Sequence, residues 1–429
     1  MTRYCVIGAG AAGLAAVKTL AESGREVDCF EQSDRVGGHW NTDYDALHLI
    51  TSRDVTGYEG FPMPADYPLF PSRDQVLAYL NAYADRFAIR QHIRFLTGVA
   101  SVVPIATTGS VGSAGWIVTT TEGREQHYDG VFVANGHLHD QRIPHVPGTF
   151  TGKQIHSGSY GNTGDIDGER VLVIGSGNSG CDIAVDAAQS RLTTAICVRR
   201  GHFFQPKTFF GVPRAELGFL REFTFEEQDL LTRLMIRASK GTWENYPGLP
   251  EPPFRTLAEG APVVNDLLLY WIHHGRISVV PGLGRFEGRT VHFVDGTSRG
   301  FDTIIWATGF HPTVPFLDPA LVRTRGGVPL RTAGGVVPAG LDRLYLIGMA
   351  APRGPQIMLY PIQSRLALAM VQLWEDGWDG SLAAAFEAEQ ALDDRIDMIR
   401  PDWEAQMSHA RELLLAWTGE VRAGTRALV

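Results

Sequence analysis

The chain has 429 residues, of which 44% are hydrophobic and 20% charged, and its formal net charge is −9. This length predicts two or three domains with a large core, and the negative charge, without a basic stripe, argues against nucleic-acid binding. No apolar run approaches the roughly 18 residues of a membrane span, and a strand-like segment already begins at Arg3, which argues against a secretory signal.

From these features we expect a soluble, cytoplasmic protein. Four cysteines lie in or beside predicted strands and helices, without CxxC or metal-ligand spacing: Cys5, Cys29, Cys181 and Cys197. We therefore predict buried free thiols and no metal site. The final residues, VRAGTRALV, contain no hydrophobic anchor, so we expect no membrane attachment, and a homodimer is the expected assembly.

The N-terminal segment predicts a dinucleotide-binding turn. Residues 3–7 form a predicted strand, and an alanine-rich helix follows a turn that contains Gly8, Gly10 and Gly13. Glycines allow a tight turn and close approach of the backbone to a pyrophosphate, which the helix N-terminus attracts. A second predicted strand ends at Glu31, and an acidic side chain at this distance accepts the ribose hydroxyls of an adenosine.

The segments that follow can line or cover a site. A turn with Gly38 and Trp40 permits close approach to a ligand, although it is equally compatible with a simple loop. Residues 46–71 are rich in proline and aromatic residues and lack periodicity, as is common in segments that cover sites. Residues 72–87 carry apolar residues at helical spacing, and residues 93–103 predict a strand.

One pattern occurs twice in the chain. A β-meander over residues 116–134 ends in Ala134-Asn-Gly136, and a second, ending at residue 306, leads into Ala307, Thr308 and Gly309. A second glycine turn precedes the second meander and follows the apolar run VLVI. This turn and its helix start contain Gly175, Gly177, Asn178, Ser179 and Gly180. An internal duplication of this size is a signal at the level of the fold.

We therefore predict an α/β protein with two Rossmann-like dinucleotide-binding domains, the second inserted into the first. The first domain comprises residues 1–160 and 300–429, the latter including C-terminal helices. The inserted domain comprises residues 161–299 and carries a helical insertion. The other predicted helices span residues 224–239, 262–274, 363–374, 382–398 and 403–417.

The two glycine turns differ in the charge that follows the next strand. Glu31 suits an unphosphorylated ribose, as in FAD or NAD. The second copy has Arg199 and Arg200 instead, with Lys207 shortly after. Guanidinium groups pair with phosphate through a fork of donors, and no carboxylate is present to repel it, so the pattern favours NADPH. The alternative is that two arginines at a strand end are solvated surface charges.

Four further motifs, spread over the chain, point to one family. They are Gly38-His-Trp40, Phe150-x-Gly152-x-x-x-His156-x-x-x-Tyr160, Gly177-Asn-Ser-Gly180-x-Asp182-Ile-Ala184 and Asp302-x-x-Ile305-x-Ala307-Thr-Gly309-Phe310. The chain thereby resembles the class B flavin-dependent monooxygenases, the flavin-containing monooxygenase (FMO) family. The resemblance implies FAD and NADPH as cofactors, a C4a-hydroperoxyflavin formed with O2, and oxygenation of nitrogen or sulfur in a small molecule.

The resemblance also implies roles for individual residues. Ser52 and Tyr160 are the implied catalytic residues, with Ser52 near the place where many members have an asparagine over the flavin. The further implied cofactor contacts are His48, Thr51, His156 and Gln363. Structural roles are alternatives for His156 and Gln363, and a core position is the alternative for Tyr160. Arg53 and Asp54 are weaker candidates for groups that face the substrate.

Departures from the family pattern leave other functions open. Gly161 stands after Tyr160, where the family has Lys or Arg, and this pair replaces the Trp-Pro of Baeyer–Villiger enzymes. The phrase Tyr44-Asp-x-Leu47-His48-Leu49 is similar to the plant auxin-pathway branch, which acts on indole-3-pyruvate. Baeyer–Villiger oxidation and oxidative decarboxylation of such a keto acid are therefore alternatives. An NADPH–flavin electron-transfer reductase and a flavoprotein that only binds are alternatives from other classes.

Overall fold

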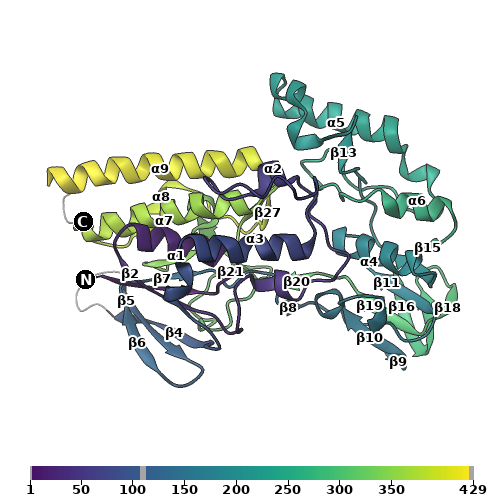
Figure 1. Cartoon of the computed structure of the whole chain (residues 1–429), viewed down its shortest axis with the longest axis horizontal. Coiled ribbons are helices and arrows are strands. Elements are labelled where there is room, and N and C mark those ends of the chain that lie inside the picture. Colours follow the sequence, from purple (N-terminus) through teal and green to yellow (C-terminus); the bar gives the residue numbers. More distant parts are fainter. Residues whose placement is uncertain (1, 107–112, 425–429) are drawn as a thin grey trace.

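The computed structural model describes residues 2–106 and 113–424, and its frame is a pair of five-stranded parallel sheets, one in each half (Figure 1). The first sheet has the order β25 (Leu344–Leu346), β7 (Gly130–Val133), β1 (Arg3–Ile7), β2 (Glu26–Phe30) and β3 (Ile93–Arg94). The second has the order β10 (Lys153–His156), β19 (Thr303–Trp306), β11 (Arg170–Ile174), β12 (Thr193–Cys197) and β15 (Ile277–Val280). Their apolar strands are largely buried, as parallel sheets covered by helices require.

The second sheet is built by a segment that leaves the first half and returns to it. β25 follows β19 in the chain but pairs with β7 of the first sheet. The second unit is therefore inserted into the first, as the duplication predicts. β10 and β19 lie outside the predicted limits of 161 and 299, yet both belong to the second sheet. By strand pairing, this sheet extends beyond the predicted limits at both ends.

Helices cover the sheets and smaller sheets flank them. The helices are α1 (Ala11–Glu22), α2 (Arg53–Thr56), α3 (Arg73–Arg86), α4 (Asn178–Gln189), α5 (Phe225–Lys240), α6 (Leu267–His273), α7 (Tyr360–Glu375), α8 (Leu382–Glu389) and α9 (Arg400–Ala423). The first meander forms β4 (Val99–Ala106), β5 (Ser113–Thr120) and β6 (Glu125–Tyr128). The second forms β16 (Leu283–Gly288), β17 (Thr290–Phe293) and β18 (Ser298–Gly300), beside β9 (Gly148–Phe150).

The duplicated glycines make the same contacts in both halves. Gly8 has a φ of +100°, and a Cβ there would lie 2.6 Å from the carbonyl oxygen of Ala134. Gly175 has a φ of +110°, and a Cβ there would lie 2.3 Å from the carbonyl oxygen of Ala307. In each turn the last glycine packs on the first, because a Cβ at Gly13 would lie 1.8 Å from the Gly8 oxygen. The Ala-x-Gly phrase is thus the packing partner of the glycine turn.

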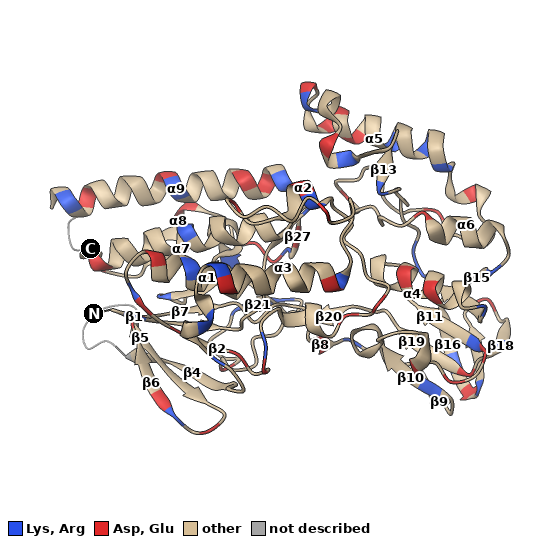
Figure 2. Cartoon of the chain, in the orientation of Figure 1, with Lys and Arg blue, Asp and Glu red and all other residues tan. Residues whose placement is uncertain are grey.

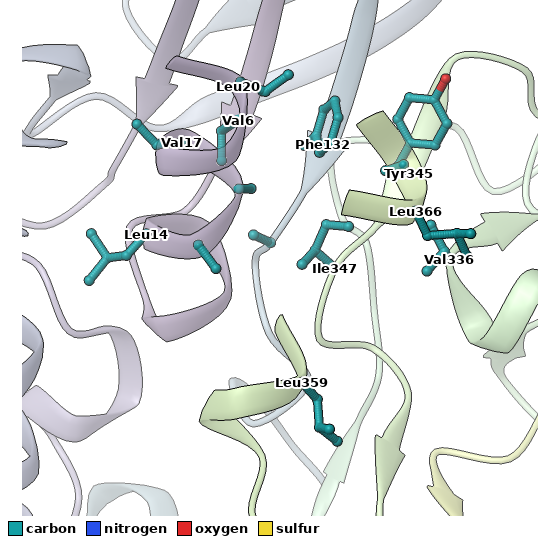
Figure 3. Packing of buried hydrophobic residues seen from close by; sticks show 14 of the residues in the cluster. Val6, Leu14, Val17, Leu20, Phe132, Val336, Tyr345, Ile347, Leu359 and Leu366 are labelled. Atoms are coloured by element: carbon teal, nitrogen blue, oxygen red, sulfur yellow. The ribbon is translucent and has the colours of Figure 1, made fainter. Parts of the chain in front are cut away.

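A hydrophobic core holds α1 and α7 on the first sheet. Val6 of β1, Leu14 of α1, Phe132 of β7 and Leu366 of α7 belong to one buried cluster, which Figure 3 shows from close by. Burial of side chains of this size contributes roughly 1.5–3 kcal/mol each. A second cluster joins β11, β12, α4 and α6 in the other half. Each half therefore has its own core, as two domains require.

Tertiary contacts shorten three of the predicted elements. The predicted strand 93–103 is divided, because Leu96 adopts a positive φ of 53° between β3 and β4. The predicted helix 262–274 begins only at α6, where the Asn265 side chain accepts a hydrogen bond from the backbone N–H of Leu268. The predicted helix 382–398 ends with α8, because Asp393 pairs its backbone with Arg331 instead.

The inserted helical segment stands over the second half. Figure 1 shows α5 above α4 and α6, on the side away from β9 and β10. Thr224 and Glu227 form a capping box at the start of α5, which agrees with the predicted helix 224–239. The segment before α5 contains the short hairpin of β13 (Thr208–Phe209) and β14 (Val212–Pro213), followed by the 3₁₀ turn η5 (Arg214–Glu216).

Charged residues of both signs and four cysteines are distributed over the two halves. Figure 2 shows acidic and basic residues interspersed over the described parts of both halves, without a stripe of one sign. All four cysteines are free and buried, which confirms that prediction. Within residues 2–106 and 113–424, none of the helices combines the length and apolarity that crossing a bilayer requires. Residues 425–429 of the C-terminal segment considered above lie outside the described residues.

Two glycines of the second turn provide a matched pair for a stability test. A Cβ at Gly180 would lie 2.1 Å from the Gly175 oxygen, whereas a Cβ at Gly177 would have no neighbour within 4 Å. Overpacking costs about 1–3 kcal/mol, so we expect Gly180→Ala to lower the apparent melting temperature by about 3–10 °C. Gly177→Ala should lower it by less than about 2 °C. Thermal denaturation followed by circular dichroism measures both; equal shifts would contradict this packing.

Candidate cofactor and active site

The main cavity of the molecule has a volume of about 1600 Å³ and lies where strands of the first sheet end. Ile7 of β1, Phe30 of β2, and Ala134 and Ile347 just after β7 and β25 all line it. The carboxyl ends of parallel strands are the usual position of ligand sites in open α/β sheets. Asn178 of α4 and Gln205 of the inserted segment also line this cavity, so both halves contribute to it.

The first glycine turn forms a cradle at one side of the cavity. Gly10 is the N-cap of α1 and supplies no side-chain cap, and Ala11 and Ala12 of the first helical turn line the cavity. Gly38 approaches this turn so closely that a Cβ there would lie 3.1 Å from the Gly10 Cα atom. Trp40 lies beside it and is half-buried. An uncapped helix N-terminus between glycines suits an anion such as a pyrophosphate.

Glu31 is a buried carboxylate at the end of β2 and lines the cavity. One carboxylate oxygen accepts a hydrogen bond from the Ala9 N–H at 2.7 Å. The other accepts from the N–H and the hydroxyl of Ser33, each at 2.8 Å. Glu31 is therefore held in a fixed orientation beside the glycine turn, where the sequence analysis predicts a ribose.

Five buried polar atoms in the wall of this cavity have no hydrogen-bond partner among the described residues. They are Oδ1 of Asn41, Oδ1 of Asn135, Nδ1 of His137, Oε1 of Gln205 and Oε1 of Gln356. A buried polar atom left without a partner costs about 1–3 kcal/mol. Burial lowers the pKa of His137 to about 4, so its imidazole is neutral at pH 7. The cavity wall is therefore prepared for a polar ligand.

The predicted catalytic residue Ser52 lies in the cavity wall and is fully buried. Its hydroxyl donates a hydrogen bond to Glu216 of η5, so it joins the first half to the inserted segment. The neighbouring Thr51 also lines the cavity, and its hydroxyl pairs with that of Thr56 at 2.8 Å. Arg53 and Asp54 are not among the lining residues, and Arg53 bonds to the Tyr67 carbonyl and to Asp54.

Tyr160, the other predicted catalytic residue, is placed differently. It is fully buried within the core of the second half, and its hydroxyl donates to Asp186 of α4 at 2.7 Å. Burial is the main cause of the raised pKa of this phenol. Tyr160 does not line the cavity. In this geometry the core alternative holds, and nothing brings the Tyr160 hydroxyl to the site.

Gln363 and His156 act through the backbone of loops. Gln363 is buried on α7, and its Oε1 accepts a hydrogen bond from the N–H of Gly348, a residue that lines the cavity. His156 is the buried last residue of β10, with Nδ1 accepting from the Gly158 N–H and Nε2 facing the Gly309 carbonyl at 3.0 Å. Neither side chain lines the cavity itself. Both therefore position the residues that do.

The second glycine turn is open to solvent. Gly177 is exposed and is the N-cap of α4, again without a side-chain cap. Asn178 accepts a hydrogen bond from the N–H of Val264, which fixes the loop before α6 beside the helix start. Ser179 is half-buried, and Gly180 packs on Gly175 as described above.

The three basic residues predicted for NADPH lie in different surroundings. Arg199 and Arg200 are exposed at the end of β12, and the guanidinium of Arg200 lies 5.1 Å from the centre of the Phe254 ring. Lys207 lines the main cavity instead, and its ammonium donates to the Leu49 carbonyl at 3.0 Å. Burial lowers the pKa of Lys207. The arginines are thus free to meet a ligand at the surface, whereas Lys207 faces the interior.

A second cleft, of about 1060 Å³, adjoins the main cavity and shares Lys207 and Val264 with it. The predicted cofactor residue His48 is exposed and lines this cleft, not the main cavity. Asp182 of α4 also lines it and accepts hydrogen bonds from Tyr44 and Asn265. His48 is therefore separated from the glycine cradle that it was predicted to accompany.

The Ala307–Gly309 linker packs against the second glycine turn. Ala307 packs on Gly180, and the Thr308 carbonyl accepts two hydrogen bonds from Arg142, at 2.7 and 2.9 Å. None of the three linker residues lines the main cavity. The linker therefore holds the glycine turn of the second half, and its side chains do not reach the main cavity.

Sequence reasoning missed part of the cavity wall. Asn135 and His137 follow β7 directly, and the first of them lies inside the Ala134-Asn-Gly136 phrase that the duplication singled out. Arg214 and Glu216 of η5 come from a segment without readable pattern. Their position depends on how the inserted segment folds back over the first half, and no local sequence signal encodes this.

Two dinucleotide-binding units that share one cavity define the class of two-domain flavoprotein oxidoreductases. The family model described as "Flavin-binding monooxygenase-like" matches residues 1–374. Flavin-containing monooxygenase 3 of Homo sapiens is 32% identical over 400 residues, covering 86% of this chain and 74% of the relative. Flavin-containing monooxygenase 5 of Homo sapiens is 31% identical over 394 residues, covering 85% and 72%. The chain belongs to the flavin-containing monooxygenase family.

Solved structures of this class have the same fold. The flavin-containing monooxygenase from Stenotrophomonas maltophilia matches with a TM-score of 0.64 and 23% identity, covering 98% of this chain and 99% of that one. A mutant cyclohexanone monooxygenase from Rhodococcus sp. Phi1, bound to NADP+, matches with a TM-score of 0.69 and 19% identity, covering 99% of each. With the family match, the protein is a flavin-dependent NADPH monooxygenase, and its cofactors are FAD and NADPH.

The hydrogen bond between Ser52 and Glu216 is a testable tie between the halves. A hydrogen bond to a charged group contributes about 1.5–3 kcal/mol. We therefore expect Ser52→Ala to speed hydrogen–deuterium exchange over residues 214–222 by roughly tenfold or more. Thr51→Ala is the matched control, because the Thr51 hydroxyl bonds within its own loop. Unchanged exchange in Ser52→Ala would show that other contacts hold the segment.

Proposed function

We propose that this protein uses NADPH and O2 to insert one oxygen atom at a nitrogen or sulfur centre of a small molecule. For a sulfide, one O2, one NADPH and one proton give the sulfoxide, NADP+ and water, so that one oxygen atom enters the product and the other leaves as water. When bound, FAD would be held by the glycine cradle and Glu31 of the first half and would supply the redox chemistry that couples oxidation of NADPH to activation of O2. The observation that carries the proposal is the single cavity to which both nucleotide-binding halves contribute.

The first half has the features that an FAD site needs. We assign the pyrophosphate to the cradle of Gly8, Gly10 and Gly38, where the uncapped start of α1 lines the cavity. We assign the adenosine ribose to Glu31, whose carboxylate keeps a fixed orientation through its bonds to Ala9 and Ser33. The unpaired atoms of Asn41, Asn135, His137 and Gln356 are partners for the remaining polar groups of FAD.

The second half has the features that an NADPH site needs. The start of α4, with Gly177 and Asn178, is uncapped and open to a pyrophosphate. Arg199 and Arg200 are exposed at the end of the next strand, where a 2′-phosphate would meet them. Gly13 and Gly180 contribute by letting each helix approach its strand, and they are packing residues.

The side chains around the cavity position groups and exclude water. Ser52 and Glu216 close the inserted segment over the flavin-side loop, and Gln363 holds the Gly348 N–H in the cavity wall. A dry and closely packed site is what a reactive oxygen intermediate requires. Because the cofactor supplies the redox chemistry, the protein groups only position ligands and exclude water. A site built from loops and backbone groups, without a positioned acid–base pair, is sufficient for this role.

The indole-3-pyruvate alternative gains no support from this geometry. Tyr44, Leu47, His48 and Leu49 carry the similarity to that branch, and of these Leu49 lines the main cavity. The Tyr44 hydroxyl is bonded to Asp182, and His48 lines the second cleft. Neither residue lines the main cavity. We therefore keep nitrogen or sulfur oxygenation as the proposed reaction.

Isotope incorporation tests the proposal directly. The holoenzyme is supplied with NADPH, ¹⁸O2 and thioanisole or N,N-dimethylaniline, and the product is analysed by mass spectrometry. We expect one ¹⁸O atom per product and NADPH consumption that rises with substrate. Stopped-flow mixing of the NADPH-reduced enzyme with O2 should give a long-lived near-ultraviolet absorbance. Rapid reduction of an electron acceptor without ¹⁸O incorporation would instead favour a reductase.

Glu31→Ala should weaken FAD binding. The change removes the acceptor proposed for the ribose and the anchor of the Ala9 N–H, and a bond to a charged group contributes about 1.5–3 kcal/mol. We expect the FAD dissociation constant to rise about 10- to 100-fold, measured by fluorescence titration of the apoprotein. Glu26→Ala removes an exposed carboxylate at the opposite end of β2 and is the control. An unchanged constant in Glu31→Ala would place the ribose elsewhere.

The double variant Arg199→Gln/Arg200→Gln should lose its preference for NADPH. Each guanidinium bond to a phosphate contributes about 1.5–3 kcal/mol. We expect kcat/KM for NADPH to fall about 10- to 100-fold while that for NADH changes by less than about twofold. Initial rates of coenzyme oxidation, followed by the absorbance of the reduced nicotinamide, measure both. Arg191→Gln, at the start of the same strand, is the control, and an equal loss for both coenzymes would argue against a 2′-phosphate contact.

A further inference from the structure

Arg214 is a half-buried arginine in the cavity wall, and its guanidinium forms no ion pair with a carboxylate of the described residues. It lies in η5, and its Nε donates to the Thr232 hydroxyl of α5 at 3.1 Å. Within the described part of the chain, this is the only hydrogen bond or ion pair of the side chain. Burial lowers the pKa of Arg214 more than the nearby Asp229 raises it, so its surroundings compensate its charge incompletely.

Asp229 is the carboxylate whose charge acts on Arg214, yet its two oxygens are bonded to other groups, and it forms no ion pair with Arg214 among the described residues. One accepts from Nε of Arg233 at 2.7 Å, and the other from the N–H of Leu257 at 2.6 Å. An arginine side chain stays protonated at neutral pH even when buried. Arg214 therefore keeps a positive charge in the cavity wall, and its two Nη groups have no hydrogen-bond partner among the described residues.

The other basic residues of the cavity wall are satisfied. The arginines among them form ion pairs, Arg35 with Asp34, Arg353 with Asp397 and Arg400 with Glu404. Lys207 donates to the Leu49 carbonyl. Among the described arginines that line the cavity, Arg214 alone lacks a carboxylate. This difference points to a ligand that brings its own negative charge.

The position of Arg214 places that ligand beside the flavin-side loop. Glu216, two residues on, holds the hydroxyl of Ser52, so η5 is fastened against the loop of Thr51 and Ser52. Pro213, Phe225 and Leu257 give this wall apolar surface, and its two carboxylates near Arg214 are already hydrogen-bonded, Glu216 by Ser52 and Asp229 by Arg233 and Leu257. A guanidinium without a direct carboxylate partner, beside apolar surface, suits a small organic molecule that ends in an anionic group.

We propose that Arg214 binds a carboxylate of the substrate, so that the enzyme acts on small organic acids that carry the nitrogen or sulfur to be oxygenated. The inference rests on the proposed function. The planar guanidinium matches a carboxylate through two parallel N–H···O bonds. The phosphates of FAD and NADPH are the other candidate anions, but we assign them to the helix starts of α1 and α4, whereas Arg214 lies in η5, which Glu216 fastens to the loop of Ser52. The substrate is therefore the better match.

A matched pair of sulfides tests the inference. The probes are 3-(methylthio)propanoate and its methyl ester, which differ in the charge and in one methyl group, and the sulfoxide is measured with holoenzyme and NADPH. We expect the native enzyme to prefer the acid, and Arg214→Gln to lower the acid-to-ester ratio of kcat/KM about 10- to 100-fold. Arg214→Lys should keep part of the preference. Arg221→Gln, exposed on the same segment outside the cavity, should keep all of it.

Binding is measured separately, by calorimetric titration of the oxidised holoenzyme with each probe. Tighter binding of the acid, lost in Arg214→Gln at unchanged FAD content, supports the inference even if no sulfoxide forms. In that case the proposed function alone fails. Equal binding and equal turnover of acid and ester overturn the inference and leave the proposed function intact. A raised KM for NADPH in Arg214→Gln, with the acid-to-ester ratio unchanged, also overturns it and assigns Arg214 to the nucleotide.

Discussion

Close packing at the strand–turn–helix junctions is the constraint on which the rest of the structure depends. At Gly8 and Gly175 the turn presses against the carbonyl of an alanine on the neighbouring strand, at distances that leave no room for a side chain. Only this approach starts the helix directly above the strand end, with its free N–H groups toward a ligand. The meander before Ala134 or Ala307 returns the partner strand to that place. Glycine turn, meander and Ala-x-Gly phrase are thus one physical unit, used twice.

Polar contacts from one loop join the two units. Residues 44–52 of the first half are joined to the second by several hydrogen bonds, among them Tyr44 to Asp182, Lys207 to the Leu49 carbonyl, and Ser52 to Glu216. Interfaces between domains of one chain are often polar and allow relative motion. The loop is short in regular structure, so its shape depends on these contacts. The part of the chain that the sequence marks as a cover is therefore also the connection between the halves.

The sequence predicted the elements whose cause is local. The strand–glycine–helix units and the helix that begins at Thr224 follow from short-range patterns, and the insertion of one unit in the other follows from the repeat of these patterns along the chain. Tyr160, His48 and Lys207 show the limit, because a motif identifies a residue type but not the direction of its side chain. Tyr160 bonds to Asp186 in the core, and His48 faces the second cleft. Arg214 lay beyond prediction, because its surroundings come from segments that meet only in the folded chain.

Buried polar atoms without a hydrogen-bond partner among the described residues, rather than motif residues, identify the part of the cavity wall that is suited to bind a ligand. Gln363 and His156 are bonded to backbone groups of the protein, so they hold the wall in place. Asn135, His137 and Gln356 instead keep buried atoms without partners, and each such atom costs about 1–3 kcal/mol. A ligand that supplies these partners removes the cost and binds only the folded state. Cofactor binding and the stability of the first half are therefore coupled. The unpaired polar atoms lower the free energy of unfolding of the protein without cofactor, and their hydrogen bonds to the cofactor raise it when the cofactor is bound.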